Sequence, residues 1–205
     1  MPATKGKRRT YISGGQTRAD TAAMRAAEAL GMKTGGYLPG GFKKRRRKTG
    51  NGPLWYTGQE EVPRFGKAGY ILRSQKNVDR GDVTIALRMH PSCGTDKTIA
   101  YATTHAWPKS SPGWPVPDGA WNTTRPDSRY KSVIVVQAFT AGAVHDVRAF
   151  LEELDPAVVN ICGNREAGTD YERKAESFLR QCLDTGSRQE PPNPDKQLMF
   201  DDAKI

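Results

Sequence analysis

Residues 10–20 read TYISGGQTRAD and contain the clearest indication of the architecture of this chain. The first four residues are mostly apolar or β-branched and predict a short strand, and the two glycines after them predict a tight turn. An alanine-rich helix is expected over 19–30, and Gly31 supplies its stop. Strand, glycine turn and helix in this order are typical of one unit of a parallel α/β sheet.

The same order repeats along the rest of the chain. The later strands are continuous apolar runs without polar alternation, which is typical of a parallel sheet covered on both faces. The sequence therefore predicts an α/β protein with a Rossmann-like, doubly wound, mostly parallel sheet and helices on both faces. Strands are expected at 10–13, 34–37, 83–87, 132–136 and 158–161, and further helices at 74–79, 94–105, 144–154 and 171–183.

The chain length favours a single domain. At 205 residues and 22.6 kDa the chain is long enough to bury a substantial core. Two stretches lack clear periodicity: a basic loop over 38–69 and an insertion rich in proline and tryptophan over 108–129. The expected organisation is a basic extension over 1–9, the Rossmann-like domain over 10–184 and a flexible tail over 185–205.

The positive charge is concentrated in the first quarter of the chain. The whole chain has 32 Lys and Arg against 22 Asp and Glu, and residues 1–50 alone have 13 against 2. Such charge attracts phosphate, either on nucleic acid or on a small anionic ligand, although a solvated loop without a specific partner is an equal alternative. No aromatic residue interrupts the run to stack bases. The run consists of Lys43, Lys44, Arg45, Arg46, Arg47 and Lys48.

Several classes of protein are excluded by missing patterns. No window approaches 18 consecutive apolar residues, so no membrane-spanning helix is expected. The three cysteines form no CxxC motif, and the His and Cys residues lack zinc spacing, so neither a disulfide framework nor a direct protein–metal site is expected. A reducing, cytoplasmic location fits this cysteine usage. The motifs GxGxxG, GxxxxGK(S/T) and GxSxG are absent.

Four glycine-bearing segments fall at the carboxyl ends of the expected strands, over 13–17, 35–37, 92–95 and 163–166. Because the carboxyl ends of parallel strands meet at one edge of a sheet, these segments are expected to lie close together. Glycines let a ligand approach the backbone, and helix N-termini offer free N–H groups to a phosphate or another oxyanion. Candidate ligand-binding residues in these segments are Gly14, Gly15, Gln16, Thr17, Gly35, Gly36, Gly94, Thr95, Gly163, Arg165 and Glu166.

Two aspartates are also expected near this site. Asp20 is most simply an acid at a helix N-terminus, and Asp82 is a residue just before a strand. Either could instead bind a sugar hydroxyl or a protonated ring nitrogen. The histidines His90, His105 and His145 have no partner at catalytic spacing, so surface or packing roles are expected for them.

The motifs, in their order along the chain, resemble those of the circularly permuted YpsA family, also described as molybdenum cofactor carrier proteins, in the SLOG group of Rossmann-like folds. The resemblance covers about residues 10–183. It rests on ISGGQT at 12–17 with Asp20, GGYLP at 35–39, RxxxNVxxGDxT at 73–84, GTxxT at 94–98 and NIxGxRE at 160–166.

The resemblance implies a binding protein for an anionic, phosphate-bearing ligand, either molybdenum cofactor (molybdopterin) or a nucleotide. It implies that residues 14–17 with Gly94, Thr95 and Lys97 take the oxyanion, and that Arg18, Arg73 and Arg165 supply positive charge. Asn77 and Asp82 belong to the matching motif as well. Relatives of this fold commonly form homo-oligomers, so a dimer or a tetramer is expected.

The chain departs from the family pattern at a few positions. Arg18 and Cys93 stand where the family has glycine, and Asn164 stands where it has proline. In the related LOG-type phosphoribohydrolases a catalytic glutamate lies where this chain has Lys97 or Thr98, which favours binding without hydrolysis.

Two alternatives stay open at this point. One is a LOG-type nucleotide N-glycosidase with Asp96 or Glu166 as its acid. The other is a nucleic-acid-binding accessory protein that acts through the basic run 43–48.

Overall fold

The computed structural model of the chain describes residues 9–16, 18–40, 58–64, 66–106, 120–123, 131–164 and 170–184. Some predicted features lie outside these residues: the extension over 1–8, Thr17, the basic run 43–48, Arg165, Glu166 and the tail 185–205.

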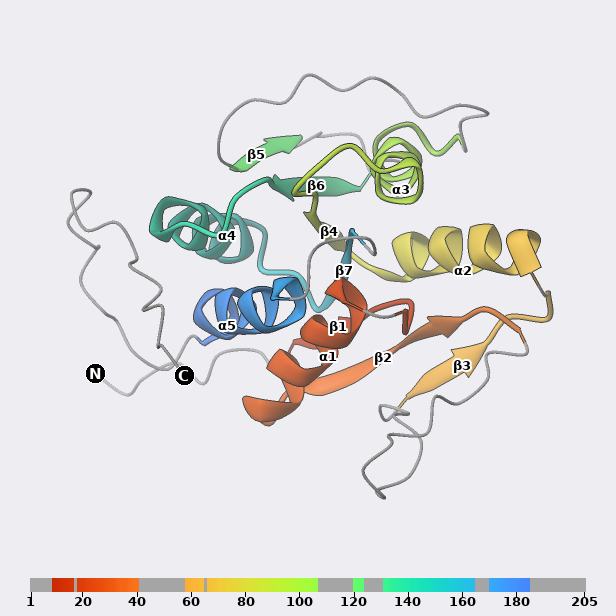
Figure 1. Cartoon of the computed structure of the whole chain (residues 1–205), viewed down its shortest axis with the longest axis horizontal. Coiled ribbons are helices and arrows are strands. Elements are labelled where there is room, and N and C mark those ends of the chain that lie inside the picture. Colours follow the sequence, from red (N-terminus) through yellow and green to blue (C-terminus); the bar gives the residue numbers. More distant parts are fainter. Residues whose placement is uncertain are drawn as a thin grey trace.

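Strands and helices alternate along most of the described chain (Figure 1). The strands form a sheet in the order β3-β2-β1-β7-β4-β6-β5, and every described pairing is parallel except that of β5 with β6. The strands are β1 (Thr10–Ile12), β2 (Lys33–Leu38), β3 (Gln59–Glu61), β4 (Val83–Leu87), β5 (Ala120–Thr123), β6 (Ser132–Val136) and β7 (Val158–Gly163). The helices are α1 (Ala19–Ala29), α2 (Gly66–Arg80), α3 (Cys93–Thr104), α4 (Ala141–Leu154) and α5 (Tyr171–Leu183).

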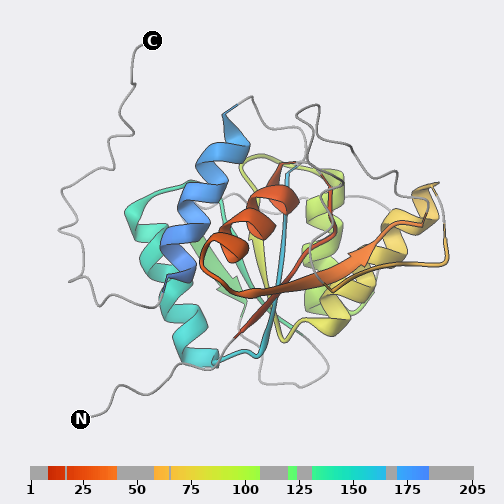
Figure 2. The same ribbon diagram turned by 90° about the horizontal axis from the view of Figure 1, so that it is seen from below.

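Helices cover both faces of the sheet, which confirms the predicted Rossmann-like architecture. Helices α1, α4 and α5 lie on one face, and α2 and α3 lie on the other (Figures 1 and 2). The strand residues divide between the two faces in alternation, because successive side chains of a strand point to opposite sides. In β4, Ile85 and Leu87 join the cluster under α1, α4 and α5, whereas Ala86 joins the cluster under α2 and α3.

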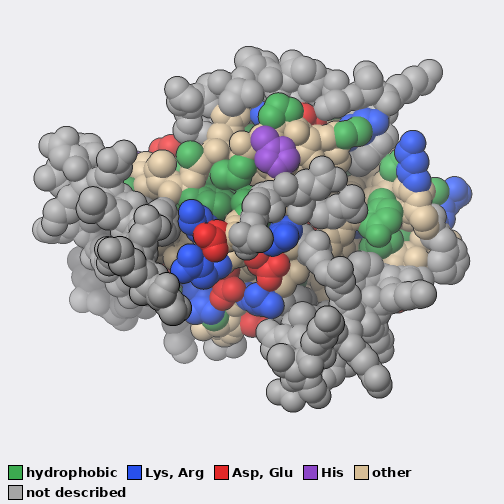
Figure 3. Space-filling view, viewed as in Figure 1, with side chains coloured by type: hydrophobic (Ala, Val, Ile, Leu, Met, Phe, Trp, Pro, Cys, Tyr) green, Lys and Arg blue, Asp and Glu red, His purple; other side chains and the backbone are tan. Residues whose placement is uncertain are grey.

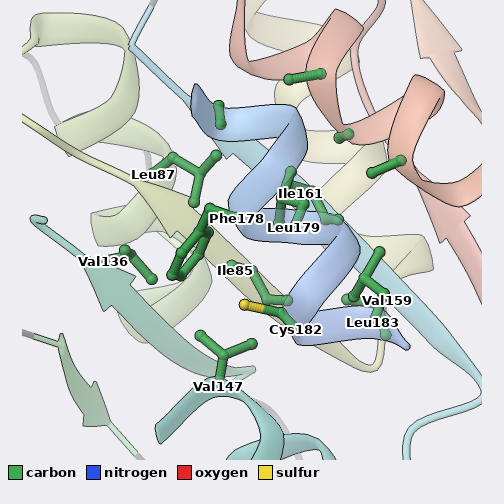
Figure 4. Close-up of a cluster of buried hydrophobic side chains, with 14 of the residues drawn as sticks. Ile85, Leu87, Val136, Val147, Val159, Ile161, Phe178, Leu179, Cys182 and Leu183 are labelled. Carbon is green, nitrogen blue, oxygen red and sulfur yellow. The ribbon is translucent and has the colours of Figure 1, made fainter. Parts of the chain in front are cut away.

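The larger of the two apolar clusters lies between the central strands and α5. Figure 4 shows Phe178, Leu179 and Cys182 of α5 directed toward Ile85 and Ile161 of the strands. All five side chains are almost completely removed from solvent. Burial of this apolar surface is the main stabilising contribution to the sheet, at roughly 25 cal/mol per Å² removed from water.

Helix α1 packs closely on α5 because its inner face carries small side chains. The buried residues of α1 include five alanines, which let the two helices approach each other. On the solvent side, Arg25 of α1 pairs with Glu172 of α5 at 2.7 Å. Figure 3 shows basic and acidic side chains mixed over this pair of helices.

The structure corrects the predicted loop over 38–69, which contains strand β3 and the first turn of α2. Helix α2 begins at Gly66, eight residues before the expected helix over 74–79. Its buried stripe includes Gly69, Arg73 and Asn77 at helical spacing, and only Val78 among its buried residues is strongly apolar. The hydrophobic pattern that normally reveals a helix is therefore missing from its first three turns.

Two further positions differ from the prediction. The insertion over 108–129 contains β5, which pairs in antiparallel orientation with β6 at the edge of the sheet. Gly35 and Gly36, expected at the carboxyl end of a strand over 34–37, lie inside β2, which runs on to Leu38. Gly35 pairs with Ile12, the last residue of β1, so β2 continues beyond the end of its neighbour.

The five described helices have 11 to 15 residues. None of them is long and apolar enough to cross a membrane.

Candidate functional site

A cavity of about 650 Å³ lies at the carboxyl edge of the sheet, between the N-terminal halves of α2 and α3. Its size falls within the range of ordinary small-molecule sites. The turn between β1 and α1 and the end of β7 complete the lining. The lining residues are Gln16, Asp20, Gly66, Lys67, Tyr70, Ile71, Arg73, Ser74, His90, Pro91, Ser92, Cys93, Gly94, Thr95, Lys97, Thr98, Cys162 and Gly163.

The start of α3 presents unpaired backbone donors to this cavity. Within the described part of the chain, the N–H groups of Cys93, Gly94 and Thr95 have no acceptor, and the first paired N–H is that of Asp96, which donates to the carbonyl of Ser92 at 2.8 Å. The side chain of Ser92 does not cap the helix. Three free N–H groups at the positive end of a helix dipole favour an anion.

Gly94 leaves space at this helix end. Apart from its chain neighbours and the backbone of its own helix, no atom of the described residues lies within 4 Å of a Cβ built on Gly94. The fold itself therefore does not require glycine at this position, and the open space beside the free N–H groups can receive a ligand.

An arginine and an aspartate meet at the floor of the cavity. Arg73 is 7% exposed and Asp20 is 4% exposed, and Nη1 of Arg73 lies 3.5 Å from Oδ2 of Asp20. The backbone N–H of Gln16 donates to the same Oδ2 at 2.9 Å. The Nε of Arg73 is buried and has no acceptor among the described residues. The guanidinium lies against the backbone of Gly14, where any Cβ would collide with it.

Burial raises the pKa of the Asp20 carboxyl above its ordinary value, although Arg73, the N–H of Gln16 and the hydroxyl of Ser13 act in the opposite direction. Burial also raises the pKa of the neighbouring Cys162 thiol to about 12, and the Asp20 carboxylate adds to this effect. Cys162 is therefore a neutral thiol at physiological pH, and burial works against the charged form of Asp20.

The cavity lining carries more positive than negative charge. Lys67, Arg73 and Lys97 line it, and Asp20 is the single acidic residue among the described lining residues. Tyr70 and Ile71 of α2 give it an apolar wall. In the described part of the chain, no three His, Cys, Asp or Glu residues lie close enough together to hold a metal ion. The site thus suits an organic anion better than a bare cation.

The structure brings seven of the predicted site residues together, from four separate segments of the chain. They are Gln16, Asp20, Arg73, Gly94, Thr95, Lys97 and Gly163. Seven others lie outside the cavity lining: Gly14, Gly15, Arg18, Gly35, Gly36, Asn77 and Asp82. Thr17, Arg165 and Glu166 lie outside the described residues.

Asp82 is at the wrong edge of the sheet for a ligand contact. It precedes β4, and its Oδ2 accepts the backbone N–H groups of Ala157 and Val158, each at 2.8 Å. Asp82 therefore fixes the start of β7 at the amino edge, and the prediction that it lies near the site was wrong.

Asn77 and Gly36 shape the strand β2. The amide of Asn77 accepts the N–H of Tyr37 at 2.7 Å and donates to the carbonyl of Tyr37 at 3.1 Å. Gly36 has φ of 119°, and a Cβ there would collide with the backbone of Ser13. Both residues belong to the framework behind the cavity.

Arg18 adopts a backbone conformation that favours glycine, with φ of 73° immediately before α1. Its N–H donates to Glu172 of α5 at 3.3 Å. The predicted cation at the mouth of the first turn is therefore not among the residues that line the cavity.

Asp96, one of the two acids considered for catalysis, is not in the cavity lining either. It is 1% exposed, and both its oxygens accept from Arg88, at 2.5 and 3.3 Å. This carboxylate forms a buried ion pair with Arg88. Its position therefore does not suit a proton donor to a ligand in the cavity.

Sequence reasoning missed the contribution of α2, namely Gly66, Lys67, Tyr70, Ile71 and Ser74, because these residues fell in or beside the expected loop. It also missed how His90 is held in the lining. The side chain of Asn164 accepts the N–H of His90 at 3.3 Å and donates to its carbonyl at 3.2 Å. Asn164, where the family pattern has proline, thus ties the end of β7 to the loop before α3.

Comparison with known proteins agrees with this architecture. A crystal structure from Syntrophus aciditrophicus, of a protein named "Putative molybdenum carrier protein", matches with a TM-score of 0.62 at 21% identity, over 88% of this chain and 98% of that chain. No curated protein matches the sequence significantly. Residues 11–111, which contain β1 to α3 and most of the cavity lining, match the sequence model of one family. That family is the circularly permutated YpsA SLOG family.

Proposed function

We propose that this chain is a binding protein whose cavity holds a small phosphate-bearing anion, and that the ligand is molybdenum cofactor. The observation that carries the proposal is the start of α3, where three free N–H groups and an open space face a cavity that also contains Lys67, Arg73 and Lys97. Charge-assisted hydrogen bonds of this kind are the strongest that a phosphate can receive from a protein.

The choice of molybdenum cofactor has support of a different kind. The structural neighbour carries the name of a molybdenum carrier, and the family match covers most of the cavity lining. The cofactor is a pterin bearing a phosphate, and the volume of the cavity is suitable for a molecule of this type. In this proposal the molybdenum is part of the cargo and needs no ligand from the protein.

The test uses native mass spectrometry of the purified chain with added molybdenum cofactor. The wild type is expected to retain one cofactor per chain. Gly94→Glu places a negative charge in the open space beside the free N–H groups, and it should weaken binding at least about tenfold by repulsion and occlusion.

Gly142→Glu is the matched control, because Gly142 is the second residue of α4 as Gly94 is of α3. Among the described residues outside its own helix backbone and chain neighbours, a Cβ on Gly142 meets only the Thr140 hydroxyl, at 3.9 Å. An acid in the first turn has the same favourable effect on either helix dipole, so the control separates binding from helix stability. A wild type that retains no cofactor, or a Gly94→Glu variant that binds as the wild type does, would contradict the proposal.

A further inference from the structure

The cavity offers two polar groups with opposite preferences. The start of α3 attracts an anion, whereas Asp20 repels one and accepts hydrogen-bond donors. These groups follow β4 and β1, which are separated by β7 in the sheet. Two strand spacings amount to about 10 Å. A single tetrahedral oxyanion is too small to satisfy both groups at once.

Asp20 is fixed in position for a ligand contact. Its Oδ2 is held by the N–H of Gln16 at 2.9 Å and by Arg73 at 3.5 Å, so the carboxyl cannot turn away from the cavity without losing both contacts. A buried carboxylate gains most from N–H donors that replace lost water, and two adjacent donors on a ring edge are the best match for it.

Tyr70 gives the cavity an aromatic surface. Its side chain is 39% exposed, and it is the single large hydrophobic residue in the exposed class within the described part of the chain. It projects from α2 with Ile71, while Pro91 lines the cavity from the loop before α3. Exposed aromatic surface inside a polar cavity suits the face of a flat ring.

We infer that the cavity selects a phosphate-bearing flat ring with adjacent N–H and NH₂ donors, as in guanine or a 2-amino-4-oxopteridine. The phosphate binds at the start of α3, the ring lies against Tyr70, and its donor edge faces Asp20. This inference rests on the proposed function and adds to it the direction of the ligand and the residue that reads the ring. Adenine is disfavoured, because its ring nitrogen presents a lone pair where guanine presents an N–H.

The test is isothermal titration calorimetry with GMP, AMP, inorganic phosphate and molybdate. GMP is expected to bind at least about tenfold more tightly than AMP, which corresponds to one good hydrogen bond to a charged group. Phosphate and molybdate should bind more weakly than either nucleotide, because they cannot contact Tyr70.

Two variants assign these preferences to residues. Asp20→Asn offers both a donor and an acceptor to the ring edge, so it should abolish the difference between GMP and AMP while leaving phosphate binding intact. Tyr70→Ala should weaken both nucleotides about tenfold and leave phosphate unchanged, and Tyr70→Phe should restore the nucleotides. Tyr70 is exposed, so this second pair of variants does not depend on the tolerance of a buried site.

The outcomes separate the inference from the proposed function. If molybdate or phosphate binds as tightly as GMP, the ring contacts are wrong although the anion site remains. If AMP binds as tightly as GMP, or if Asp20→Asn keeps the preference, Asp20 does not read the ring. If no nucleotide and no molybdenum cofactor binds, the proposed function fails with it.

Discussion

Two buried arginine–aspartate pairs lie at the carboxyl edge of the sheet, and they differ in how well they are satisfied. Arg88 donates two hydrogen bonds to Asp96, at 2.5 and 3.3 Å. Arg73 makes one contact with Asp20, at 3.5 Å, and its Nε has no acceptor among the described residues. The tight pair lies outside the cavity lining, and the loose pair is part of it. Nη1 of Arg88 also lacks an acceptor among the described residues, so the two pairs differ in the number and length of their contacts. The pair with two hydrogen bonds serves the fold, and the single long contact of Arg73 leaves charge for a ligand.

The largest expected effect comes from breaking the tight pair. Asp96→Ala leaves the Arg88 guanidinium buried without its carboxylate, and it should lower the free energy of unfolding by about 3–5 kcal/mol. Urea denaturation monitored by circular dichroism measures the loss. The double variant Arg88→Met/Asp96→Ala should recover much of it, because no unpaired charge is then buried. A loss below 1 kcal/mol in the single variant would mean that this pair is not a structural element.

Breaking the loose pair should have a smaller effect on stability and a larger one on binding. Arg73→Met removes a guanidinium that makes a single long contact, and the expected loss is about 1–2 kcal/mol of unfolding free energy. Ligand affinity should fall about tenfold, because a buried positive charge disappears from the lining of a cavity that binds an anion. The two measurements are urea denaturation and calorimetric titration. If Arg73→Met unfolds as easily as Asp96→Ala, the distinction between the two pairs is lost.

The smallest effect concerns the charge of Asp20 in the ligand-free protein. Its pKa is raised above the unfolded value of 3.8, so the folded protein holds this proton more strongly than the unfolded chain does. Between the unfolded pKa and the folded pKa of Asp20, the free energy of unfolding falls as pH rises. Above the folded pKa, the whole of this loss of stability is present. Asp20→Asn cannot ionise, so at pH 7 it should melt a few degrees higher than the wild type.

The control for this prediction is the pH dependence of the difference in melting temperature between Asp20→Asn and the wild type. The charged or titratable groups that influence Asp20 or are influenced by it are Arg73, Cys162 and Tyr171. Neither the thiol nor the phenol ionises near neutral pH, because burial raises both pKa values, so Asp20 dominates the difference. The melting temperatures of the two proteins should converge below pH 4. A difference that is independent of pH would assign the effect to packing.

The order of elements and the layers were predictable because the central strands are continuous apolar runs. The half of the site that comes from βα turns was predictable for a related reason, since parallel strands bring their carboxyl ends to one edge. Asp20, Gly94 and Thr95 were found in this way. Asp82 was misplaced, although a residue that precedes a parallel strand must lie at the opposite edge from one that follows it.

The other half of the site could not be predicted from local pattern. Arg73 and Asn77 occupy the buried stripe of α2, where apolar side chains would have revealed the helix. The pairing of Arg88 with Asp96 depends on the path of the loop between β4 and α3, and no local pattern indicates which acid an arginine will meet. Buried polar side chains bind specific partners that no hydrophobic pattern reveals. The sequence was therefore least informative around the site, where such side chains are concentrated.

The two hydrogen bonds from Asn164 to the backbone of His90 have a thermodynamic meaning for binding. They hold the loop before α3 in place from the end of β7. This loop therefore loses its conformational entropy when the protein folds. Ligand binding then costs little further conformational entropy in the loop. Preorganisation of this kind lets a modest number of polar contacts produce useful affinity, and it places the loop among the parts of the cavity that keep one shape in the free and bound states.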